Sequence, residues 1–509
     1  MLAIKQNSLY TRLSQTRVSR SRQPMQLRSI LLFLLAFIAG FISPFHDVRA
    51  GEATPLNLPD IGDAGGNLIT PEQERLIGRE FMRSVRRSLD ILDDPAVTAY
   101  LQNLGERLIS QVDGHEQKVT FFLINDPSIN AFAGPGGYIG VHAGLILSAR
   151  TEGELVSVLA HELSHVVQRH LVRSFEAGQR VEIATIAAMI AAILIGSQNP
   201  QAGQAVLTGA MAGSAQQQLS YSRMHEQEAD RVGITMMARA GFDPRQMVSF
   251  FETLQSANRY AGLRALELLQ THPLTLSRIA DARNRAEQIT TGSKGDDLTF
   301  QLIKARVKVL SGDSIYLQRQ KTADEIPQAA IQYRQALSWL SEKQYDKARN
   351  AIRQLLKNDT QRVLYHLTAA EIELAADKPQ AAHKVLASAL ILFPNNLPLT
   401  EMLAETLLKE GNATEASALL EQQLRYRPER RLYALHFQAA KTARRYADAY
   451  QSLAELHYID GNTVQAITYL KQAIEQGTKS QYEQLAMQAR LAAWKKEVQT
   501  AQADGSEKH

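Results

Sequence analysis

The feature that most constrains this chain is the H-E-L-S-H motif at residues 161–165. In an α-helix its two histidines project from one face, and the glutamate lies beside them. Two neutral imidazoles can hold one Zn²⁺ there, while the glutamate is too short to be a ligand but can reach an attacking water. We therefore predict one zinc ion per chain bound by His161 and His165, with Glu162 as the general base.

The residues around the motif predict a buried helix. Thr151 and Glu154 have the spacing of a capping box, and no proline interrupts the run that follows as far as Phe175. Apolar residues cover nearly every face of this run, which is typical of a core helix. A continuous helix would turn His170 well away from the two motif histidines, so we expect His170 to lie at the surface.

A third ligand must come from another segment, because Gln168 and Leu171 stand where a metzincin requires Gly and His. The best candidates are Glu226 and Asp230, which lie four positions apart on one apolar helical stripe. Like charges at this spacing repel each other and are normally avoided on an inward face. We predict that Glu226 is the third ligand, and that Asp230 accepts the spare N–H of a ligand histidine or moves protons. Glu228 lies off the stripe and is expected on a solvated face.

Three motifs together resemble those of a known family. They are N-A-F-A-G-P-G-G-Y-I at 130–139, H-E-L-S-H, and E-Q-E-A-D at 226–230, and they are similar to motifs of the gluzincins related to the CAAX prenyl protease and the bacterial heat-shock membrane protease. The resemblance covers about residues 65–290 and implies a zinc metalloendopeptidase domain. The whole chain is most similar to periplasmic members that help assemble outer-membrane β-barrel proteins or degrade those that stall. The implied partners are unfolded or stalled outer-membrane proteins and their assembly machinery.

The first 50 residues have the pattern of a secretory signal peptide. Six basic residues and no acidic residue precede the apolar run Ile30–Ile42, and Val48 and Ala50 provide small side chains for cleavage after Ala50. The apolar run is short for a membrane span, with an uncleaved anchor as the alternative and Met25 as an alternative start. We predict export to the periplasm.

The net charge of +4 comes largely from this N-terminal segment. Seven of the 56 basic residues and one of the 52 acidic residues lie in 1–50, so 49 basic and 51 acidic residues remain. The basic character therefore gives no support to nucleic-acid binding, and we expect no nucleic-acid partner. The chain has no cysteine, which excludes disulfides and leaves zinc ligation to histidine and carboxylate side chains.

Upstream of the motif, the sequence predicts helices that begin at Pro71 and Pro95 and a short strand over 119–124. A glycine-rich turn at 134–137 precedes a second strand over 138–141. In an endopeptidase, such a strand at a sheet edge can bind a substrate backbone by β-augmentation, the alternative being a plain hairpin that supports the zinc helix. The predicted substrate-binding residues are Gly137, Tyr138, Ile139, Gly140 and Val141.

Two apolar runs of small residues, Val181–Gly196 and Ala202–Ala215, separate the motif from Glu226. Neither run reaches the length of a membrane span. A buried helical hairpin is the simplest interpretation, and a mobile lid or a surface that contacts a membrane or an unfolded substrate is the alternative. Peripheral membrane contact through 181–215 is therefore one expected interaction.

His272 precedes Pro273, which places it outside a regular helix. Its ring can donate to a developing oxyanion opposite the metal. It can instead occupy the fourth zinc position and inhibit the resting enzyme, or have only a structural role at a helix entry. We count His272 as a catalytic candidate together with Glu162 and Asp230.

Beyond residue 291 the sequence is helical and repeats with a period of 34 residues, which is the tetratricopeptide period. Two sets of residues recur at this spacing: Ala348, Ala382 and Ala416, and Pro394 and Pro428. Such repeats form solenoids with a concave binding face. We predict about four repeats over 326–478, although Tyr450 stands where the next alanine is expected.

The predicted fold is mainly α: a gluzincin-type α+β metallopeptidase domain, with helices and a small sheet, followed by an α-helical tetratricopeptide solenoid. The predicted segments are a signal peptide over 1–50, a flexible leader over 51–69, the zinc metallopeptidase domain over 70–290, a linker and connecting helix over 291–325, the repeats over 326–478, and a C-terminal helix and tail over 479–509. One predicted function is a zinc-dependent periplasmic endopeptidase with chaperone activity. The other is a tetratricopeptide chaperone or adaptor whose protease domain is silent or tightly inhibited.

Overall fold

The structure is a computed structural model of the 509-residue chain, and it describes residues 69–113, 118–176, 223–260, 267–289, 292–293, 295–312, 326–477 and 480–506. The predicted signal peptide, nearly all of the predicted leader and the apolar segment 181–215 lie outside these residues. Among the helices of the described ranges, none combines the length and the apolar character needed to cross a membrane.

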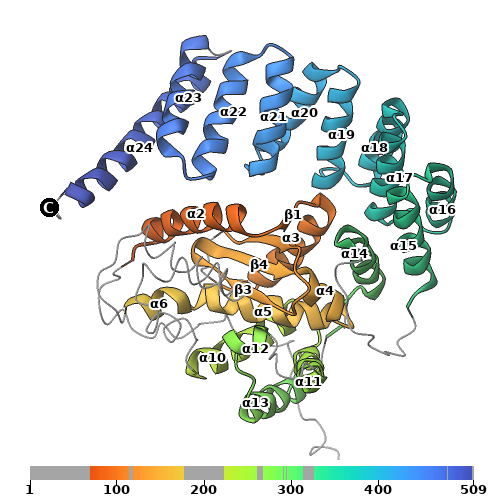
Figure 1. Cartoon of the computed structure of the whole chain (residues 1–509). Coiled ribbons are helices and arrows are strands. Elements are labelled where there is room, and N and C mark those ends of the chain that lie inside the picture. Colours follow the sequence, from red (N-terminus) through yellow and green to blue (C-terminus); the bar gives the residue numbers. More distant parts are fainter. Residues whose placement is uncertain are drawn as a thin grey trace, which may run out of the picture. The chain divides into compact units, whose positions relative to one another are not determined.

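A small four-stranded sheet organises the N-terminal part (Figure 1). Its strands are β1 (Ile91–Leu92), β2 (Thr120–Ile124), β3 (Ala131–Ala133) and β4 (Tyr138–His142), in the order β1-β2-β4-β3. The strands predicted near 119–124 and 138–141 are both present. The prediction that the second of them forms an edge is wrong, because β4 pairs with β2 on one side and with β3 on the other.

The β3–β4 pairing is close because Gly140 has no side chain. A Cβ atom at this position would lie 2.5 Å from the ring of Phe132 on β3. The substrate-binding strand predicted at Gly137, Tyr138, Ile139, Gly140 and Val141 therefore has no free side over Ile139–Val141, and β3 is the edge of the sheet instead.

Helices α2 (Pro71–Ser88) and α3 (Pro95–Ile109) begin where the sequence predicted. The Thr70–Gln73 capping box opens α2, and the Asp94 side chain caps α3. Helix α3 packs on β2, where Gly105 lies against the ring of Phe121. The turn η1 (Pro135–Gly137) precedes β4, and helix α4 (Ala143–Ser148) follows it.

The motif helix α5 (Glu152–Val167) is buried along almost its whole length, as predicted. Thr151 caps it by accepting the Glu154 amide, but the Glu154 carboxylate binds Arg150 instead of closing the capping box. The predicted continuation to Phe175 is wrong. Arg169 has a left-handed backbone (φ 50°), which breaks the helix, and the separate helix α6 (His170–Glu176) follows.

The elements that complete the N-terminal part are α10 (Arg223–Arg239), α11 (Arg245–Tyr260), α12 (Glu267–Thr271), α13 (Leu276–Glu287) and α14 (Asp297–Leu310). Helix α10 ends before Gly241, whose positive φ of 79° is the conformation of a glycine that follows a helix C-terminus. Helix α14 lies within 291–325, the segment predicted as linker and connecting helix. It packs on α3 and α4, and its apolar residues, Phe300 and Ile303 among them, belong to the same hydrophobic core.

The C-terminal part is a stack of antiparallel helix pairs (Figure 1). Its helices are α15 (Gln328–Ser341), α16 (Tyr345–Asn358), α17 (Val363–Ala375), α18 (Pro379–Leu392), α19 (Leu397–Lys409), α20 (Ala413–Leu424), α21 (Arg430–Thr442), α22 (Tyr446–Ile459), α23 (Thr463–Gln476) and α24 (Gln481–Ser506). This arrangement confirms the predicted fold class.

The recurring alanines pack where paired helices approach each other. Ala348, Ala382 and Ala416 are fully buried, each at the fourth residue of the second helix of a pair. The tight turn before α22 comes one residue early, so Ala449 rather than Tyr450 takes the equivalent buried place. The apparent loss of period at Tyr450 is thus a shortened repeat.

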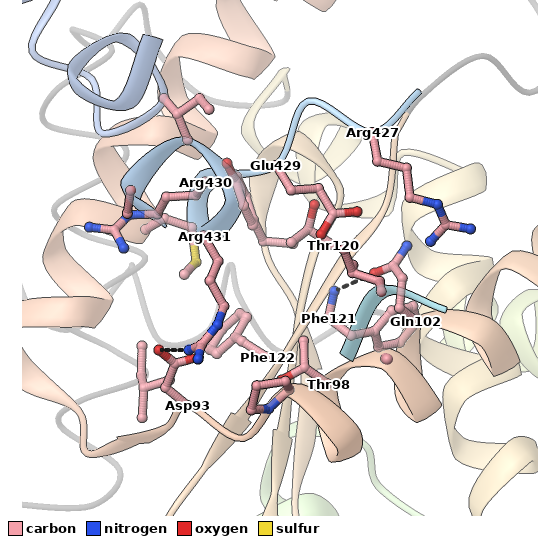
Figure 2. Close-up of a pocket in the computed structure, with 18 of the residues that line it drawn as sticks. Asp93, Thr98, Gln102, Thr120, Phe121, Phe122, Arg427, Glu429, Arg430 and Arg431 are labelled. Carbon is pink, nitrogen blue, oxygen red and sulfur yellow. Dashed lines mark hydrogen bonds and ion pairs between the residues drawn. The ribbon is translucent and has the colours of Figure 1, made fainter. Parts of the chain in front are cut away.

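Buried charge links the two parts of the chain. Arg306 on α14 is buried, with its Nη2 2.7 Å from Asp94 Oδ2 and the same atom bonded to Glu371 on α17. A cavity of about 1480 Å³ is lined by residues of α3 and β2 and by repeat residues near α21. At its border, Arg431 Nη1 lies 3.0 Å from Asp93 Oδ2 (Figure 2).

Candidate metal centre and active site

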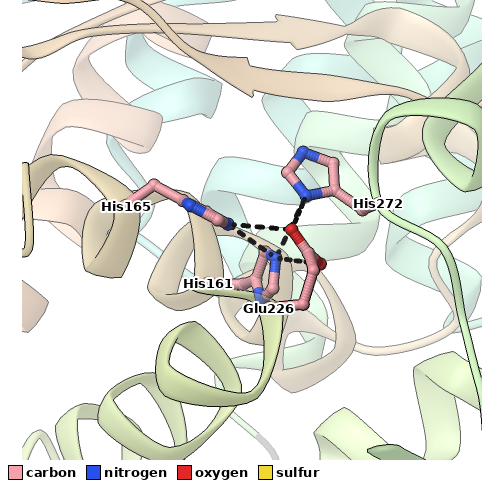
Figure 3. Close-up of side chains that lie close together, drawn as sticks. All are labelled: His161, His165, Glu226 and His272. Atoms are coloured by element: carbon pink, nitrogen blue, oxygen red, sulfur yellow. Dashed lines mark hydrogen bonds and ion pairs between the residues drawn. The ribbon is translucent and has the colours of Figure 1, made fainter. Parts of the chain in front are cut away.

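Four buried side chains converge between α5, α10 and the segment after α12 (Figure 3). They are His161, His165, Glu226 and His272, and one ligand atom of each lies within 4.8 Å of the others. The Nε2 atoms of the two α5 histidines are 3.1 Å apart. The carboxylate oxygens of Glu226 lie 3.4 Å from Nε2 of His161 and 3.5 Å from Nε2 of His165.

Close packing of α10 against α5 brings Glu226 to the histidines. The acidic stripe predicted from the sequence is buried, with Ala229, Asp230 and Gly233 on the inward face of α10. A Cβ atom on Gly233 would lie 3.3 Å from the backbone carbon of Ala160, so glycine permits this short distance between the helices.

Asp230 lies behind His161. Its Oδ1 atom is 3.0 Å from Nδ1 of His161. Arg278 on α13 holds the same carboxylate from the other side and also lies 2.8 Å from Glu226 Oε2. The sequence did not single out Arg278, because this residue lies in an arginine-rich helix and only the fold distinguishes it from its exposed neighbours Arg283 and Arg285.

Two buried carboxylates, those of Asp230 and Glu226, lie beside His161. Burial lowers the pKa of His161, but hydrogen bonds to Asp230 and Glu226 outweigh burial and raise this pKa to about 10. Burial and the nearby His161 charge hold the pKa of His165 well below its usual value. Burial acts to raise the pKa of Glu226, yet His272 and His161 hold it well below the ordinary range. The arrangement therefore favours a positive charge between the imidazoles and the carboxylate.

Glu162 is fully buried beside this cluster, and neither carboxylate oxygen has a hydrogen bond of good geometry within the described part of the chain. Burial raises the pKa of Glu162. Electrostatic interactions with His272 and His161 and the backbone amide of Ala133 act in the opposite direction, but burial is the larger effect. His272 Nε2 lies 3.5 Å from Glu162 Oε1. A buried carboxylate with unused acceptors and a raised pKa is suited to taking up a proton.

The donor set fits a zinc ion. Histidine and carboxylate side chains are common zinc ligands. Asp230 and His170 occupy the Nδ1 sides of His161 and His165, so the Nε2 lone pairs of the two ligands can face each other. Two lone pairs at 3.1 Å repel unless a cation or a proton lies between them. The residues therefore fit a metal at this position.

His170 is buried, so the prediction that it lies at the surface is wrong. Its Nδ1 is 2.8 Å from Nδ1 of His165, and its Nε2 is 3.1 Å from Oε2 of Glu228. Burial lowers the pKa of His170 to about 4, although the Glu228 hydrogen bond acts against it. His170 is buried because the motif helix breaks at Arg169. No glycine or proline marks that break in the sequence.

The side of β3 that faces away from β4 adjoins the same site. The amides of Gly134 and His142 donate to the carbonyls of Tyr138 and Asn130, so the N–H and C=O groups of Ala131 and Ala133 point away from β4. The Ala133 amide faces Glu162. This edge, and not β4, can pair with an extended peptide next to the general-base candidate.

A small apolar pocket opens beside His161 and Glu162. Its other lining residues come from α5, α11 and the segment around His272 and include Val158, Met247, Phe250, Phe251, Leu254 and Leu268. Its volume of about 30 Å³ is enough for a water molecule.

Comparison with known proteins agrees with this geometry. Residues 95–286 match the model of peptidase family M48, and residues 373–438 match a tetratricopeptide repeat model. The putative beta-barrel assembly-enhancing protease of Vibrio cholerae is 41% identical over 318 residues, which cover 61% of this chain and 66% of that protein. The beta-barrel assembly-enhancing protease of Escherichia coli K12 is 38% identical over 373 residues, covering 71% of this chain and 75% of that protein.

A more distant relative matches a shorter stretch of the chain. The mitochondrial metalloendopeptidase OMA1 of Schizosaccharomyces pombe is 31% identical over 182 residues, which cover 36% of this chain and 51% of that protein. The family implies a metal, and the convergent histidines and glutamate could bind it. The chain therefore belongs to the beta-barrel assembly-enhancing protease family, with an M48 metallopeptidase domain followed by tetratricopeptide repeats.

Proposed function

We propose that the protein is a zinc-dependent endopeptidase of the periplasm that acts on outer-membrane β-barrel proteins during their assembly or after they stall. His161, His165 and Glu226 would hold the zinc ion. The observation that carries the proposal is the convergence of these ligand atoms within 4.8 Å, beside a buried Glu162 with unused acceptors.

The outer edge of β3, where Ala133 is partly exposed, supports the proposed mechanism. The outward N–H and C=O groups of Ala131 and Ala133 would align an extended client across the site, which reads backbone rather than sequence. A bound zinc ion would polarise the scissile carbonyl and make the attacking water more acidic. Glu162 takes the proton of that water and returns it to the leaving amine. Asp230, held by Arg278, orients the ring of His161.

We propose that His272 inhibits the resting enzyme by occupying a ligand position that the attacking water needs. Its Nδ1 lies 3.3 Å from His161 Nε2 and 2.9 Å from Glu226 Oε1, which supports a place among the ligands. A client that displaces the segment around His272 would release the inhibition. The alternative role is that of an oxyanion donor.

We propose that the repeats recruit clients and their assembly machinery. Tetratricopeptide repeats present binding surfaces and no chemistry of their own. The cavity between α3, β2 and the repeats presents positively and negatively charged side chains to a partner, among them Arg427 and Glu429 (Figure 2). The relatives' names, the predicted signal peptide and the absence of cysteine support a periplasmic location.

We propose that the peptidase domain extends through α14. Because Phe300 and Ile303 belong to the hydrophobic core, a chain that ends near Gly292 would expose core residues. A chain that ends at Gly312 should fold better and cleave a flexible peptide, while failing on large clients that need residues 326–478.

A chaperone or adaptor with a tightly inhibited protease domain is the second candidate function, favoured by the place of His272 among the ligand atoms. The two functions differ in what Glu162→Gln does. In the endopeptidase, this variant loses client degradation. In the chaperone, it protects unfolded β-barrel protein from aggregation as well as the unchanged protein does.

The decisive experiment combines metal analysis and proteolysis of the full chain. We expect one zinc per chain and cleavage of an unfolded outer-membrane protein. Glu226→Ala should lose zinc and activity together, while Glu252→Ala, an exposed position on α11, should retain both. Full zinc occupancy in Glu226→Ala would show that the ligand assignment is wrong.

A further inference from the structure

A break in the motif helix places His170 next to His165, a proposed zinc ligand. In an uninterrupted helix, a residue five positions after His165 would point about 140° away from it. Helix α5 instead ends at Val167, and Arg169 adopts a left-handed backbone conformation with φ 50°. A non-glycine residue pays roughly 1–2 kcal/mol for this conformation, so contacts must stabilise it.

Contacts to the start of α2 hold Arg169 in place. Its Nη2 donates to the backbone carbonyl of Ile69 at 3.0 Å, and its side chain pairs with Glu74 at 3.2 Å. These contacts come from residues about 95 positions earlier in the chain. The break is therefore imposed by tertiary structure, and its consequence is that His170 folds back onto His165.

The resulting contacts form a chain of three side chains. Nδ1 of His165 and Nδ1 of His170 are 2.8 Å apart, and Nε2 of His170 lies 3.1 Å from Oε2 of Glu228. Both rings are buried, whereas 27% of the Glu228 side chain is exposed. Arg173 Nη1 lies 3.5 Å from the same Glu228 oxygen.

One arrangement of hydrogen-bond donors and acceptors along Glu228, His170 and His165 leaves His165 able to bind a metal ion. An ionised Glu228 can only accept, so Nε2 of His170 carries a proton and donates it. In neutral His170, Nδ1 then has a lone pair that accepts from Nδ1–H of His165. That arrangement leaves the lone pair on Nε2 of His165, on the side that faces His161 and Glu226.

We propose that His170 is a positioning residue for His165, and that together with Glu228 it selects the tautomer and ring orientation in which His165 can bind zinc. This inference rests on the ligand assignment proposed above. Asp230 has the same role for His161. The difference is that Asp230 contacts His161 directly, whereas the Glu228 carboxylate contacts His165 only through the imidazole of His170.

The test measures zinc affinity of the full-length chain by competition with a chelator. His170→Phe keeps a buried ring but removes the acceptor, and should weaken zinc binding roughly 10–100-fold, the range for lost partners of ligand histidines. His170→Gln offers an amide oxygen to His165 and an amide N–H to Glu228, and should recover most of the affinity. Glu228→Gln retains an acceptor for His170 and should bind zinc more tightly than Glu228→Ala.

His225→Phe is the matched control. The His225 ring stacks on His170 at 4.3 Å and 13°, but it is no link in the chain from Glu228 to His165. A phenyl ring preserves the stacking, so zinc affinity should stay within about twofold of the unchanged protein, well inside the effect expected for a lost partner. Substitution with Co²⁺ gives a second readout, because an altered His165 ring should shift the visible absorption bands in His170→Phe and not in the control.

Two results would overturn the inference. In one, His170→Phe binds zinc as tightly as the unchanged protein, while Glu226→Ala has lost it. In the other, His170→Phe and His170→Gln weaken zinc equally and lower the zinc-free melting temperature equally, which indicates packing rather than a hydrogen bond. If His170→Phe does not fold, the Glu228→Gln and Glu228→Ala pair decides in the same way. An unchanged protein that binds no zinc would refute the proposed function itself.

Discussion

Arg278 grips both carboxylate oxygens of Asp230, with 2.7 Å from Nε to Oδ2 and 2.8 Å from Nη2 to Oδ1. All of these groups are buried, and Asp230 in turn contacts His161. Together with His161, the guanidinium therefore offsets the charge of two carboxylates, Asp230 and Glu226, that lie buried side by side before a metal binds.

Arg278→Ala should lower the stability of the zinc-free protein by about 3–5 kcal/mol, because breaking a buried ion pair leaves a buried charge. Arg278→Lys should recover only part of this, since lysine cannot bind Asp230 through two nitrogens. Denaturant unfolding measures both. Arg283→Ala is the control: its pair with Glu252 is about half exposed on each side, and its removal should change stability by less than about 1 kcal/mol. Equal effects at 278 and 283 would contradict the argument.

Glu162→Gln should retain one zinc and the fold, and should lose roughly 10²–10⁴ in turnover, the usual contribution of a general base. Glutamine keeps the size of the side chain but cannot take up a proton. Metal analysis and single-turnover cleavage of an unfolded client check the two parts of this prediction. Normal proteolysis by the variant would remove Glu162 from the mechanism.

His272→Ala separates the two proposed roles of that residue. If His272 inhibits the resting enzyme, the variant should cleave more client and also degrade itself. If His272 is an oxyanion donor, the variant should keep zinc and lose roughly 10²–10³ in turnover. Rates at saturating client, measured with zinc content, distinguish the two. Unchanged rate and unchanged zinc affinity would dispose of both roles.

Ala133→Pro tests the β3 edge. The Ala133 amide points away from β4, so proline removes an outward N–H without breaking a sheet hydrogen bond. Zinc content should be unchanged. Because the same amide faces Glu162, kcat and KM are measured separately: a lost client hydrogen bond of roughly 0.5–1.5 kcal/mol lowers kcat/KM about 3–10-fold through KM, whereas a disturbed Glu162 lowers kcat. Ala133→Ser keeps the amide and serves as the control. A proline variant with full kcat/KM would show that clients do not pair here.

Asp126 should make stability depend on pH in the acid range. Burial acts to raise the pKa of Asp126, but hydrogen bonds to His142 and Ser128 outweigh it and lower this pKa from 3.8 to about 2. A lowered carboxyl pKa stabilises the fold above pH 3.8, and this stabilisation is lost as pH falls toward 2. Its size at neutral pH is up to about 2 kcal/mol.

Asp126→Asn should therefore be less stable than the unchanged protein at pH 7, and the difference should shrink by about half near pH 3. Urea unfolding at pH 7, 5 and 3 measures it. Asp346→Asn, at a side chain that is 95% exposed, should show no such trend. A difference that stays constant down to pH 3 would mean that the Asp126 charge has no part in stabilising the loop before β3.

Much of this protein could be predicted from local pattern. The H-E-L-S-H spacing places His161 and His165 on one helical face whatever surrounds them, because 3.6 residues per turn fixes that geometry. The burial of Glu226 and Asp230 followed from their place on an apolar stripe. The 34-residue period predicted the helix pairs, and even the exception at Tyr450 proved to be a shift of one residue.

Other features depended on contacts between distant segments. The sequence by itself determined the helix starts at Pro71 and Pro95, two of the strands, the motif helix as far as Val167 and the ligand candidates, since these follow from the pattern of neighbouring residues. Only the tertiary structure decided that β3 pairs with the outer side of β4, that Arg278 is the arginine of its helix that is buried at the site, and that the motif helix breaks at Arg169. Strand order and buried ion pairs are set by which surfaces meet, and Arg169 is held by Ile69 and Glu74, about 100 residues earlier in the chain. No window of sequence around His170 contains that contact, which is why its place behind His165 could not be predicted.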